Sequence, residues 1–304
     1  MIDTTPPGGH FSDVQISLEP DGAYTLTVGT AEFGNGTATV HQQIAATVLS
    51  TSPARIRLRQ SDTAHGGHDT GAFGSTGTVV AGRASGLASH DLREKLLDFA
   101  SAYCGAPRQR CALSGEAVTC DGKRVTLSEL HKAAIAAGRA LSGAGKTSGT
   151  PRSVAFNVQG FRVAVNRVSG VIRILKSVQA VDAGTVINPM QCRAQVEGGV
   201  AQALGAAMFE EVVIDENGRV SNPAFRNYHL PAFADVPRTE VLFASTHDRL
   251  GPFGAKPMSE SPYNPVAAAL ANALCDATGV RFFELPLKPD RIFAQIAAQA
   301  GRRR

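Results

Sequence analysis

The chain has 304 residues, of which 43% are hydrophobic and 31 are glycine, with a formal net charge of +4. This composition is typical of a globular protein with many turns, in one large or two medium domains. No apolar run reaches the roughly 18 residues of a membrane-spanning helix, and the N-terminus lacks the features of a secretory signal, so we expect a cytoplasmic protein. The charge comes partly from Arg302–Arg304, a short basic end typical of a solvated tail, so we expect no nucleic-acid partner.

The cysteine and histidine residues do not predict a metal centre. The five cysteines, at positions 104, 111, 120, 192 and 275, form no CxxC pair and no ferredoxin-like spacing, so we expect no iron–sulfur cluster on this chain. Their odd number favours reduced thiols over a disulfide framework. His65 and His68 lie close together in the sequence HGGH but lack a nearby third ligand, so we expect no metal site there.

The first half of the sequence alternates short strands with longer helical segments. Apolar and polar residues alternate in Val14–Leu18 and Tyr24–Val28, which predicts a hairpin around Pro20-Asp21-Gly22. Helical spacing follows from Val40 to Leu49, with Thr37 or Thr39 as the expected cap. The remaining predicted elements are a strand at Ile56–Leu58, a loop at Ser61–Thr78, a helix at Val79–Cys104, a hairpin around Asp121-Gly122 and a helix at Ser128–Leu141.

The segment Ser142–Arg152, SGAGKTSGTPR, has the composition of a linker. We therefore expect one unit over residues 1–147 and a second over residues 148–304. The elements predicted for the second unit are strands at Val154–Val168 and Val171–Ala180, a loop at Asp182–Pro189, a helix at Gln191–Phe209, a short hairpin around Asp215–Gly218 and a helix at Val266–Leu274. Because strand, loop and helix recur in both halves, the expected fold is α+β with two related α/β units.

Two glycine-rich loops in the first half each precede a helix. In Glu32–Thr37, EFGNGT, the glycines would let the backbone approach a ligand closely, and free N–H groups at the helix start favour an anion such as a phosphate. A tight strand-to-helix turn is the alternative for this loop. The second loop, Asp69–Thr78, carries four hydroxyl side chains and three glycines. This is more hydrogen-bonding capacity than a turn requires, which favours ligand binding.

In the second half, two segments have chemistry to offer. The helix Gln191–Phe209 places Gln202 among small residues, where its amide could bracket a heterocycle, although a helix packed by its small face is the alternative. The loop GPFGAKPMSESPYNP leads through Glu260 into a helix for which Asn264 or Ser261 is the expected cap and Pro265 suits the first turn. A carboxylate near a helix start is favoured in its ionised form, which suits a general base. Alternatively, Glu260 only complements the helix start.

Five motifs occur in one order: EFGNG-T, DTGAFGS-GTVVAG, VDAGTVINP, QVEGGVAQALG, and GPFGAKPMSESP followed by ANAL-DATGVR-FELPLKPDRI. Together they resemble the C-terminal half of the molybdenum-cofactor-binding subunit of the xanthine dehydrogenase/aldehyde oxidase family. The resemblance extends from about Val14 to Ile296. It implies the fold of the second molybdenum-cofactor-binding domain of a molybdenum hydroxylase.

The resemblance also implies a reaction and a set of site residues. Glu260 matches the catalytic base of an oxidative hydroxylation in which water supplies the oxygen and an aldehyde or N-heterocycle is the substrate. The implied cofactor is molybdenum-molybdopterin, typically molybdopterin cytosine dinucleotide in bacterial members, and no residue of this chain is expected to ligate the metal. The implied cofactor-binding residues are Gly34, Asn35, Gly36, Gly71, Ala72, Ser75 and Gln202.

This sequence departs from the family pattern in several places. Pro257 and Ser259 replace glycines of the motif GAKGVGEPP, and Thr76 stands where many relatives carry arginine. The N-terminal molybdenum-binding half of the family is absent from this sequence. We therefore expect a complementary N-terminal molybdenum-binding chain, with iron–sulfur and FAD groups on further subunits, and no turnover by this chain alone.

Two other functions are compatible with parts of the sequence. The chain could bind the molybdenum cofactor without catalysis, for storage or insertion, or could be a truncated and inactive piece. The presence of Glu260 disfavours simple cofactor binding, which requires no carboxylate facing the metal. A plain nucleotide-binding module using the Gly34–Gly36 loop is disfavoured because the Rossmann fingerprint is missing.

Overall fold

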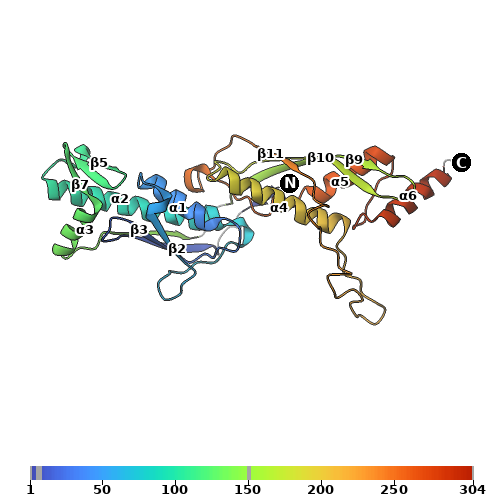
Figure 1. The fold of residues 1–304 in the computed structure, drawn as a ribbon, viewed down its shortest axis with the longest axis horizontal. Coiled ribbons are helices and arrows are strands. Elements are labelled where there is room, and N and C mark those ends of the chain that lie inside the picture. Colours follow the sequence, from blue (N-terminus) through green and yellow to red (C-terminus); the bar gives the residue numbers. More distant parts are fainter. Residues whose placement is uncertain (1, 5–8, 149–151, 303–304) are drawn as a thin grey trace.

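The computed structural model describes residues 2–4, 9–148 and 152–302, so the last two arginines of the predicted tail lie outside the described residues. The molecule is elongated, with one lobe at each end and a central region where they meet (Figure 1). Its main elements are β1 (Ile2–Thr4), β2 (Phe11–Leu18), β3 (Tyr24–Val28), α1 (Thr37–Val48), β4 (Ile56–Gln60), α2 (Gly82–Cys104), β5 (Cys111–Ser114), β6 (Ala117–Cys120), β7 (Lys123–Thr126), α3 (Leu127–Ala136), β8 (Ser142–Ser148), β9 (Val154–Val165), β10 (Ile172–Val181), α4 (Pro189–Met208), β11 (Thr239–Phe243), α5 (Val266–Thr278) and α6 (Pro289–Arg302).

Each lobe is built on a four-stranded mixed sheet, with the strand orders β4-β3-β2-β8 and β1-β9-β10-β11. In both sheets an antiparallel hairpin is followed by a helix and then by a strand that pairs in parallel with the second hairpin strand. The two series are β2-β3-α1-β4 and β9-β10-α4-β11. This recurrence confirms the expected α+β fold with two related units. It also brings the carboxyl ends of β3 and β4 to one sheet edge, and those of β10 and β11 to another.

The predicted linker is largely a strand. Ser142–Ser148 forms β8, which pairs with β2 from Phe11 to Ser17, so the linker prediction is wrong for these residues; residues 149–151 of the predicted linker lie outside the described residues. An added Cβ at Gly143 or Gly145 would lie 2.2 or 2.1 Å from carbonyl oxygens of α2. The small residues therefore reflect close packing of strand on helix rather than flexibility. The division of the chain after residue 147 stays a prediction.

Each lobe has its own main hydrophobic core. In the first lobe, inward residues of β2 and β3 such as Ile16 and Leu26 pack against Leu92 and Leu96 of α2. In the second lobe, α4 packs against α5, where Leu204 is fully buried together with neighbouring leucines. Burial of such side chains contributes about 1.5–3 kcal/mol each, so these clusters hold each lobe together.

Helix boundaries differ from the predictions because other groups bind the terminal N–H groups. The N-cap of α1 is Gly36, at φ 79°, and Thr37 already lies inside the helix. The N-cap of α5 is Pro265, in a helical conformation and without a side-chain cap, so the predicted Asn264 and Ser261 caps are wrong. A backbone turn precedes α5, in which Val266 N donates to Tyr263 O. In addition, α3 ends at Ala136 rather than at Leu141.

Cys111 and Cys120 form a disulfide, with their Cα atoms 4.0 Å apart, so the expectation of five reduced thiols is wrong for this pair. The two residues face each other directly in the antiparallel pairing of β5 with β6. Their proximity depends on the register of that hairpin, which a cysteine count cannot reveal. The turn at Asp121-Gly122, which connects β6 to β7, is present as predicted.

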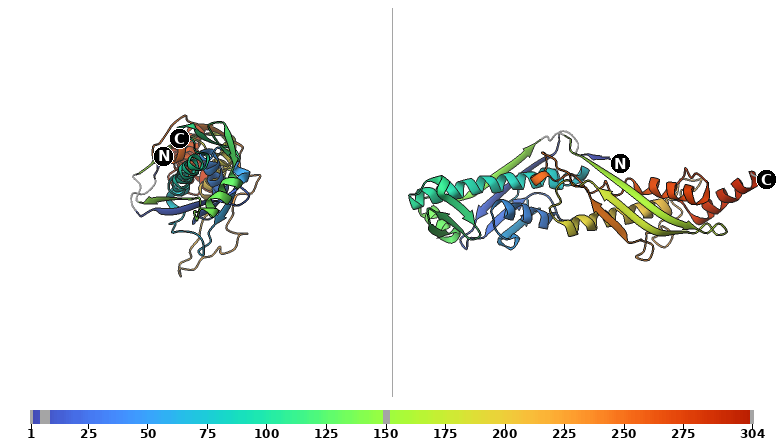
Figure 2. Two further views of the ribbon diagram at one scale, coloured as in Figure 1. Left: turned by 90° about the vertical axis from the view of Figure 1, so that its left-hand side faces the viewer. Right: turned by 90° about the horizontal axis from the view of Figure 1, so that it is seen from above.

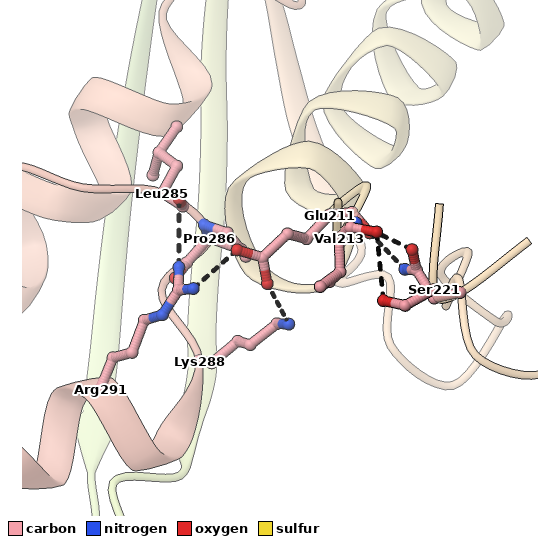
Figure 3. Close-up of polar contacts among 8 residues, drawn as sticks. Glu211, Val213, Ser221, Leu285, Pro286, Lys288 and Arg291 are labelled. Atoms are coloured by element: carbon pink, nitrogen blue, oxygen red, sulfur yellow. Dashed lines mark hydrogen bonds and ion pairs between the residues drawn. The ribbon is translucent and has the colours of Figure 1, made fainter. Parts of the chain in front are cut away.

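A long loop, residues 209–238, extends away from the second lobe (Figure 1). At its base, Glu211 accepts hydrogen bonds from Lys288 Nζ at 2.5 Å and from Arg291 Nη2 at 2.6 Å, which fixes the loop to the start of α6 (Figure 3). These two bonds hold the pKa of the Glu211 carboxyl below its usual range. The predicted turn at Asp215–Gly218 is present, flanked by a bridge between Ile214 and Val220 in place of strands.

In the part of the chain that the structure describes, no helix is long and apolar enough to cross a membrane.

Candidate functional site

Four loops meet in the central region between the lobes, and each follows the carboxyl end of a parallel strand. They lead from β3 to α1, from β4 to α2, from β10 to α4 and from β11 to α5. Together they line a cavity of about 170 Å³, using residues within 33–40, 72–78, 183–195 and 255–259. The view from above in Figure 2 shows this junction at the middle of the long axis. Ligands of open α/β sheets bind outside the carboxyl ends of the strands, which makes this cavity the candidate site.

The structure brings together some of the predicted site residues and not others. Asn35, Ala72 and Ser75 line the cavity, whereas Gln202 is exposed and lies outside its lining. Gln202 follows the cavity-lining Gln195 by two turns of α4, on the same helix face. Gly34, Gly36 and Gly71 contribute backbone to the loops at the cavity and all have positive φ, which a side chain would strain.

The loop Glu32–Thr37 already holds an anion of its own. The Glu32 carboxylate accepts hydrogen bonds from the N–H groups of Gly34 at 2.7 Å, Gly36 at 3.1 Å and Ala38 at 2.9 Å. Burial would raise the pKa of Glu32, but these backbone bonds outweigh it and hold the pKa below its usual range. An ionised side chain thus occupies N–H groups of this loop, which favours the tight-turn alternative over phosphate binding by these groups.

The second loop is held in a strained conformation at its centre. Ser75 is buried and has φ 59°, a left-handed value that is uncommon outside glycine. Its Oγ lies 2.7 Å from Ser259 Oγ and 3.4 Å from Glu260 Oε2, so it connects this loop to the predicted base. Strain of this kind costs about 1–3 kcal/mol and often persists at functional sites, where the surroundings enforce it.

The start of α4 closes the cavity with amide side chains. A Cβ at Gly36 would lie 2.9 Å from Gln191 Cδ, so glycine at this position allows α4 to approach the first lobe. Gln191 Nε2 donates to Thr39 Oγ1 at 3.2 Å, while Gln191 Oε1 has no hydrogen-bond partner among the described residues. Asn188 Nδ2 also reaches across, donating to Gln43 Oε1 at 3.2 Å. These contacts join the lobes and leave the Gln191 carbonyl oxygen as a buried acceptor beside Gly36.

The lining of the cavity fits a polar heterocycle carrying phosphate. Amides of Asn35, Gln191 and Gln195 provide paired donors and acceptors for the edge of a heterocycle. Hydroxyl groups in the lining supply donors suited to an anion, whereas the Lys256 ammonium is already paired with Asp182. Cys192 also lines the cavity, but burial raises the pKa of its thiol to about 12. Its thiol therefore stays protonated at neutral pH and is unsuited to metal binding or nucleophilic attack.

A buried ion pair fixes the loop that carries Glu260. Lys256 Nζ lies 2.8 Å from Asp182 Oδ2, and the two side chains are 14% and 10% exposed. Burial would raise the pKa of Asp182, but hydrogen bonds from Lys256 and Thr246 outweigh it and hold the pKa below its usual range. A bridge between Gly184 and Ala255 joins the same two loops through their backbones. The path of the chain toward Glu260 is thus attached to the end of β10.

Several of these residues were not predicted from the sequence. Lys256 and Asp182 each lie inside a recognised motif, but opposite charges far apart in sequence show no local pattern. Gln191 was also left without a predicted role. The position of Gln191 in the first turn of α4, directly after the VDAGTVINP loop, was a usable signal because loops before helices commonly line sites.

Comparison with known proteins identifies the family of this chain. Residues 2–237 match the family model of the molybdopterin cofactor-binding domain. The chain is 33% identical over 290 residues to the probable hypoxanthine oxidase XdhD of Escherichia coli K12, covering 94% of this chain and 30% of that protein. It is 30% identical over 301 residues to the xanthine dehydrogenase molybdenum-binding subunit of E. coli O157:H7, covering 96% and 40%.

A solved structure shares the fold of nearly the whole chain. Quinoline 2-oxidoreductase from Pseudomonas putida 86 superposes with a TM-score of 0.88 at 27% identity, over 95% of this chain and 38% of that chain. The chain therefore spans 30–40% of the length of these relatives.

Proposed function

Because this chain belongs to the molybdopterin cofactor-binding domains of the xanthine dehydrogenase/aldehyde oxidase family, we propose that it contributes the cofactor cleft and the catalytic base of a molybdenum hydroxylase. The observation that carries the proposal is the convergence of four motif loops on one cavity, with Glu260 adjoining it through Ser75. The reaction is the oxidation of an aldehyde or an N-heterocycle, with oxygen supplied by water. Relatives named for hypoxanthine, xanthine and quinoline support the heterocyclic class.

The residues that would hold the cofactor lie on both lobes. We propose that Asn35 and Ser75, with the backbone at Gly34, Gly36, Gly71 and Ala72, contact one side of molybdopterin. Gln202 lies two turns along α4 from the cavity-lining Gln195 and would contact a more distant part of the cofactor, for which we propose the cytosine dinucleotide form. When bound, the cofactor would supply the oxidising equivalents. The chain itself would orient the cofactor, limit the access of water and hold a proton acceptor.

In this proposal Glu260 takes the proton from the attacking water. Its carboxylate is exposed in this chain and contacts Ser75, rather than pairing with a cation. It is therefore free to accept a proton once the rest of the subunit covers the cleft. A non-catalytic cofactor-binding chain would have no use for such a carboxylate, so the turnover of a Glu260 variant separates the two functions.

The role of Gln202 predicts a loss of molybdenum. Gln202→Ala in the assembled enzyme should lower the molybdenum bound per protein, because a lost polar partner costs about 1–3 kcal/mol of binding. Molybdenum would be measured by elemental analysis after dialysis. The matched control is Gln295→Ala on α6, which removes the same side chain at the far end of the second lobe. Equal molybdenum contents in the two variants would remove Gln202 from the proposed cofactor site.

The proposal also requires a partner. The outer face of the second sheet exposes Phe156 at 54%, Val158 at 67% and Leu242 at 50%, and monomeric proteins rarely leave such a patch uncovered. Val158 and Leu242 are both in register with Ala180, so they belong to one face. We propose that a complementary N-terminal molybdenum-binding chain covers this face. Electrons would then pass to iron–sulfur and FAD subunits.

Assembly can be tested by purification at native expression levels. A tag on this chain should recover a second polypeptide that supplies the rest of a molybdenum-binding subunit, together with molybdenum. Val158→Asp should weaken the recovery, because it places a charge in the apolar contact. Val168→Asp is the control, since Val168 is 83% exposed in the turn between β9 and β10. A stable, cofactor-free monomer without such a partner would contradict the proposal.

A further inference from the structure

The inner face of the second sheet carries buried polar side chains below the Glu260 loop. On this face Ser177, Gln179 and Thr239 are 0–2% exposed, and Gln159 is 8% exposed. Gln159 and Gln179 lie directly opposite each other in the pairing of β9 with β10. An amide that is buried under a helix costs free energy unless it forms hydrogen bonds, so its partners indicate what it does.

The two glutamines have different partners. Gln179 Nε2 donates to Pro262 O at 2.7 Å, on a loop 83 residues away in sequence. Gln159 Nε2 instead donates within the sheet, to Ser177 Oγ at 3.0 Å and to Gly160 O at 3.2 Å. Gln179 is therefore the member of the pair that connects the sheet to the segment after Glu260.

The segment after Glu260 is held from below and from the side. A Cβ at Gly199 of α4 would lie 2.9 Å from Pro262 Cβ, so the helix backbone touches the proline. Ser261 is fully buried beside it. Pro262 is thus fixed between the sheet, through Gln179, and α4, through Gly199. Because Glu260 is two residues away, the backbone geometry at Pro262 limits where the carboxylate can lie.

The contacts of Glu260 with the first lobe are long by comparison. Its Oε2 and its backbone N lie 3.4 Å from Ser75 Oγ, close to the upper limit for a hydrogen bond. Glu260 and the preceding Ser259 are exposed. Its placement therefore depends on the anchored residues that follow it in the chain.

We propose that Gln179 is a positioning residue that sets the location of the Glu260 carboxylate through its hydrogen bond to the Pro262 carbonyl. The inference rests on the proposed role of Glu260 as the base. Gln179 does not line the cavity and would not touch substrate or cofactor. It acts by restricting the backbone from which Glu260 projects.

The first test measures the mobility of the loop that carries Glu260, independently of turnover. In the assembled, molybdenum-loaded enzyme, Gln179→Met keeps the length and burial of the side chain and removes the donor to Pro262. Backbone amide hydrogen exchange of peptides covering residues 259–266 should accelerate by about five- to tenfold. This is the factor expected when one buried hydrogen bond no longer stabilises the loop against local opening. Gln159→Met is the control, because it removes an equally buried amide on the facing strand without touching the loop. Exchange of residues 259–266 should be unchanged in that variant.

The second test measures turnover with hypoxanthine, quinoline or benzaldehyde, whichever the assembled enzyme oxidises. Gln179→Met should lower kcat by about ten- to a hundredfold, because catalysis is steeply sensitive to the position of a catalytic group, and should change KM little. Gln159→Met should keep the kcat of the parent enzyme. If Gln179→Met does not assemble, Gln179→Asn provides the same comparison. Asparagine keeps a buried amide, but its side chain is one methylene shorter, so the amide no longer reaches the Pro262 carbonyl.

The outcomes separate this inference from the proposed function. Unchanged loop exchange in Gln179→Met, or equal acceleration in Gln159→Met, would overturn the positioning role whatever the activity. Faster loop exchange together with an unchanged kcat would also overturn it, because the loop would then move without effect on the reaction. Undiminished turnover in Glu260→Gln would instead count against the proposed base, and the exchange data would still decide whether Gln179 anchors the loop.

Discussion

Glu260→Gln is expected to lower the turnover of the assembled, molybdenum-loaded enzyme by about a hundred- to ten-thousand-fold. Glutamine keeps the volume of the side chain and its hydrogen-bonding shape but cannot accept a proton as a carboxylate does, and general-base assistance contributes a factor of that size. The acid limb of the pH–rate profile should disappear with it, because that limb reports protonation of the base. Steady-state kinetics would measure both effects. The pH range should extend from about 4, near the ordinary pKa of carboxyl groups, to about 9.

The molybdenum content and stability of the Glu260→Gln variant decide between a catalytic and a structural role for Glu260. Molybdenum content and thermal stability should match the parent protein, because the Glu260 side chain is exposed and its Oε2 lies 3.4 Å from Ser75 Oγ, a long contact. Glu240→Gln on β11 is a matched control, since it changes an exposed carboxylate of the same lobe that pairs with Lys176. Loss of stability before loss of activity would favour a role for Glu260 in starting α5. Near-full turnover with molybdenum bound would exclude it as the base.

Lys256→Met is expected to have the largest effect on stability. It leaves the Asp182 carboxylate buried without its cation, a change that typically costs about 3–5 kcal/mol. For a chain of 304 residues this corresponds to a fall in Tm of roughly 5–8 °C in thermal unfolding. Lys176→Met is the control, because the ion pair of Lys176 with Glu240 is more than half exposed on both sides and such surface pairs contribute about 0–1 kcal/mol.

The pH dependence of this effect has a definite sign. In the parent protein the folded-state pKa of Asp182 is depressed, so the stabilisation is fully present above the ordinary carboxyl pKa of 3.8 and is lost as the pH falls through the folded value. In Lys256→Met the burial of Asp182 remains while its main partner is gone. The deficit should therefore be largest near neutral pH and should narrow as the pH falls toward about 4, where the carboxyl becomes neutral. A deficit independent of pH would show that the lost contacts are not electrostatic.

Much of the local structure was predictable from the sequence. Alternation in Val14–Leu18 and Tyr24–Val28 gave the first hairpin, because a half-buried strand must place apolar residues on one face. Apolar spacing likewise gave α1, α2, α4 and α5 to within a few residues. The order of the five motifs identified the family, which the match of residues 2–237 confirms.

Glycine-rich segments were the main source of wrong predictions. Glycine occurs both in flexible segments and where two backbones lie in contact, because it has no side chain. The amino-acid composition of a segment therefore does not distinguish the two cases. Ser142–Ser148 was therefore predicted as a linker although it is a strand against α2. For the Glu32–Thr37 loop the sequence left phosphate binding and a tight turn open, and only the structure shows that the Glu32 carboxylate accepts hydrogen bonds from its N–H groups.

The sequence by itself determined the first hairpin, most of the helices, the family, and the motif loops proposed as candidate sites, because these depend on local spacing and on motifs. Only the tertiary structure decided that these loops share one cavity, since that depends on the pairing of β4 with β3 and of β11 with β10. It also decided the contacts between groups far apart in the chain, such as Asp182 with Lys256 and Gln179 with Pro262. The ion pair joins residues 74 positions apart and the hydrogen bond joins residues 83 positions apart. Such contacts depend on how the elements of the second lobe pack together, which no local sequence pattern indicates.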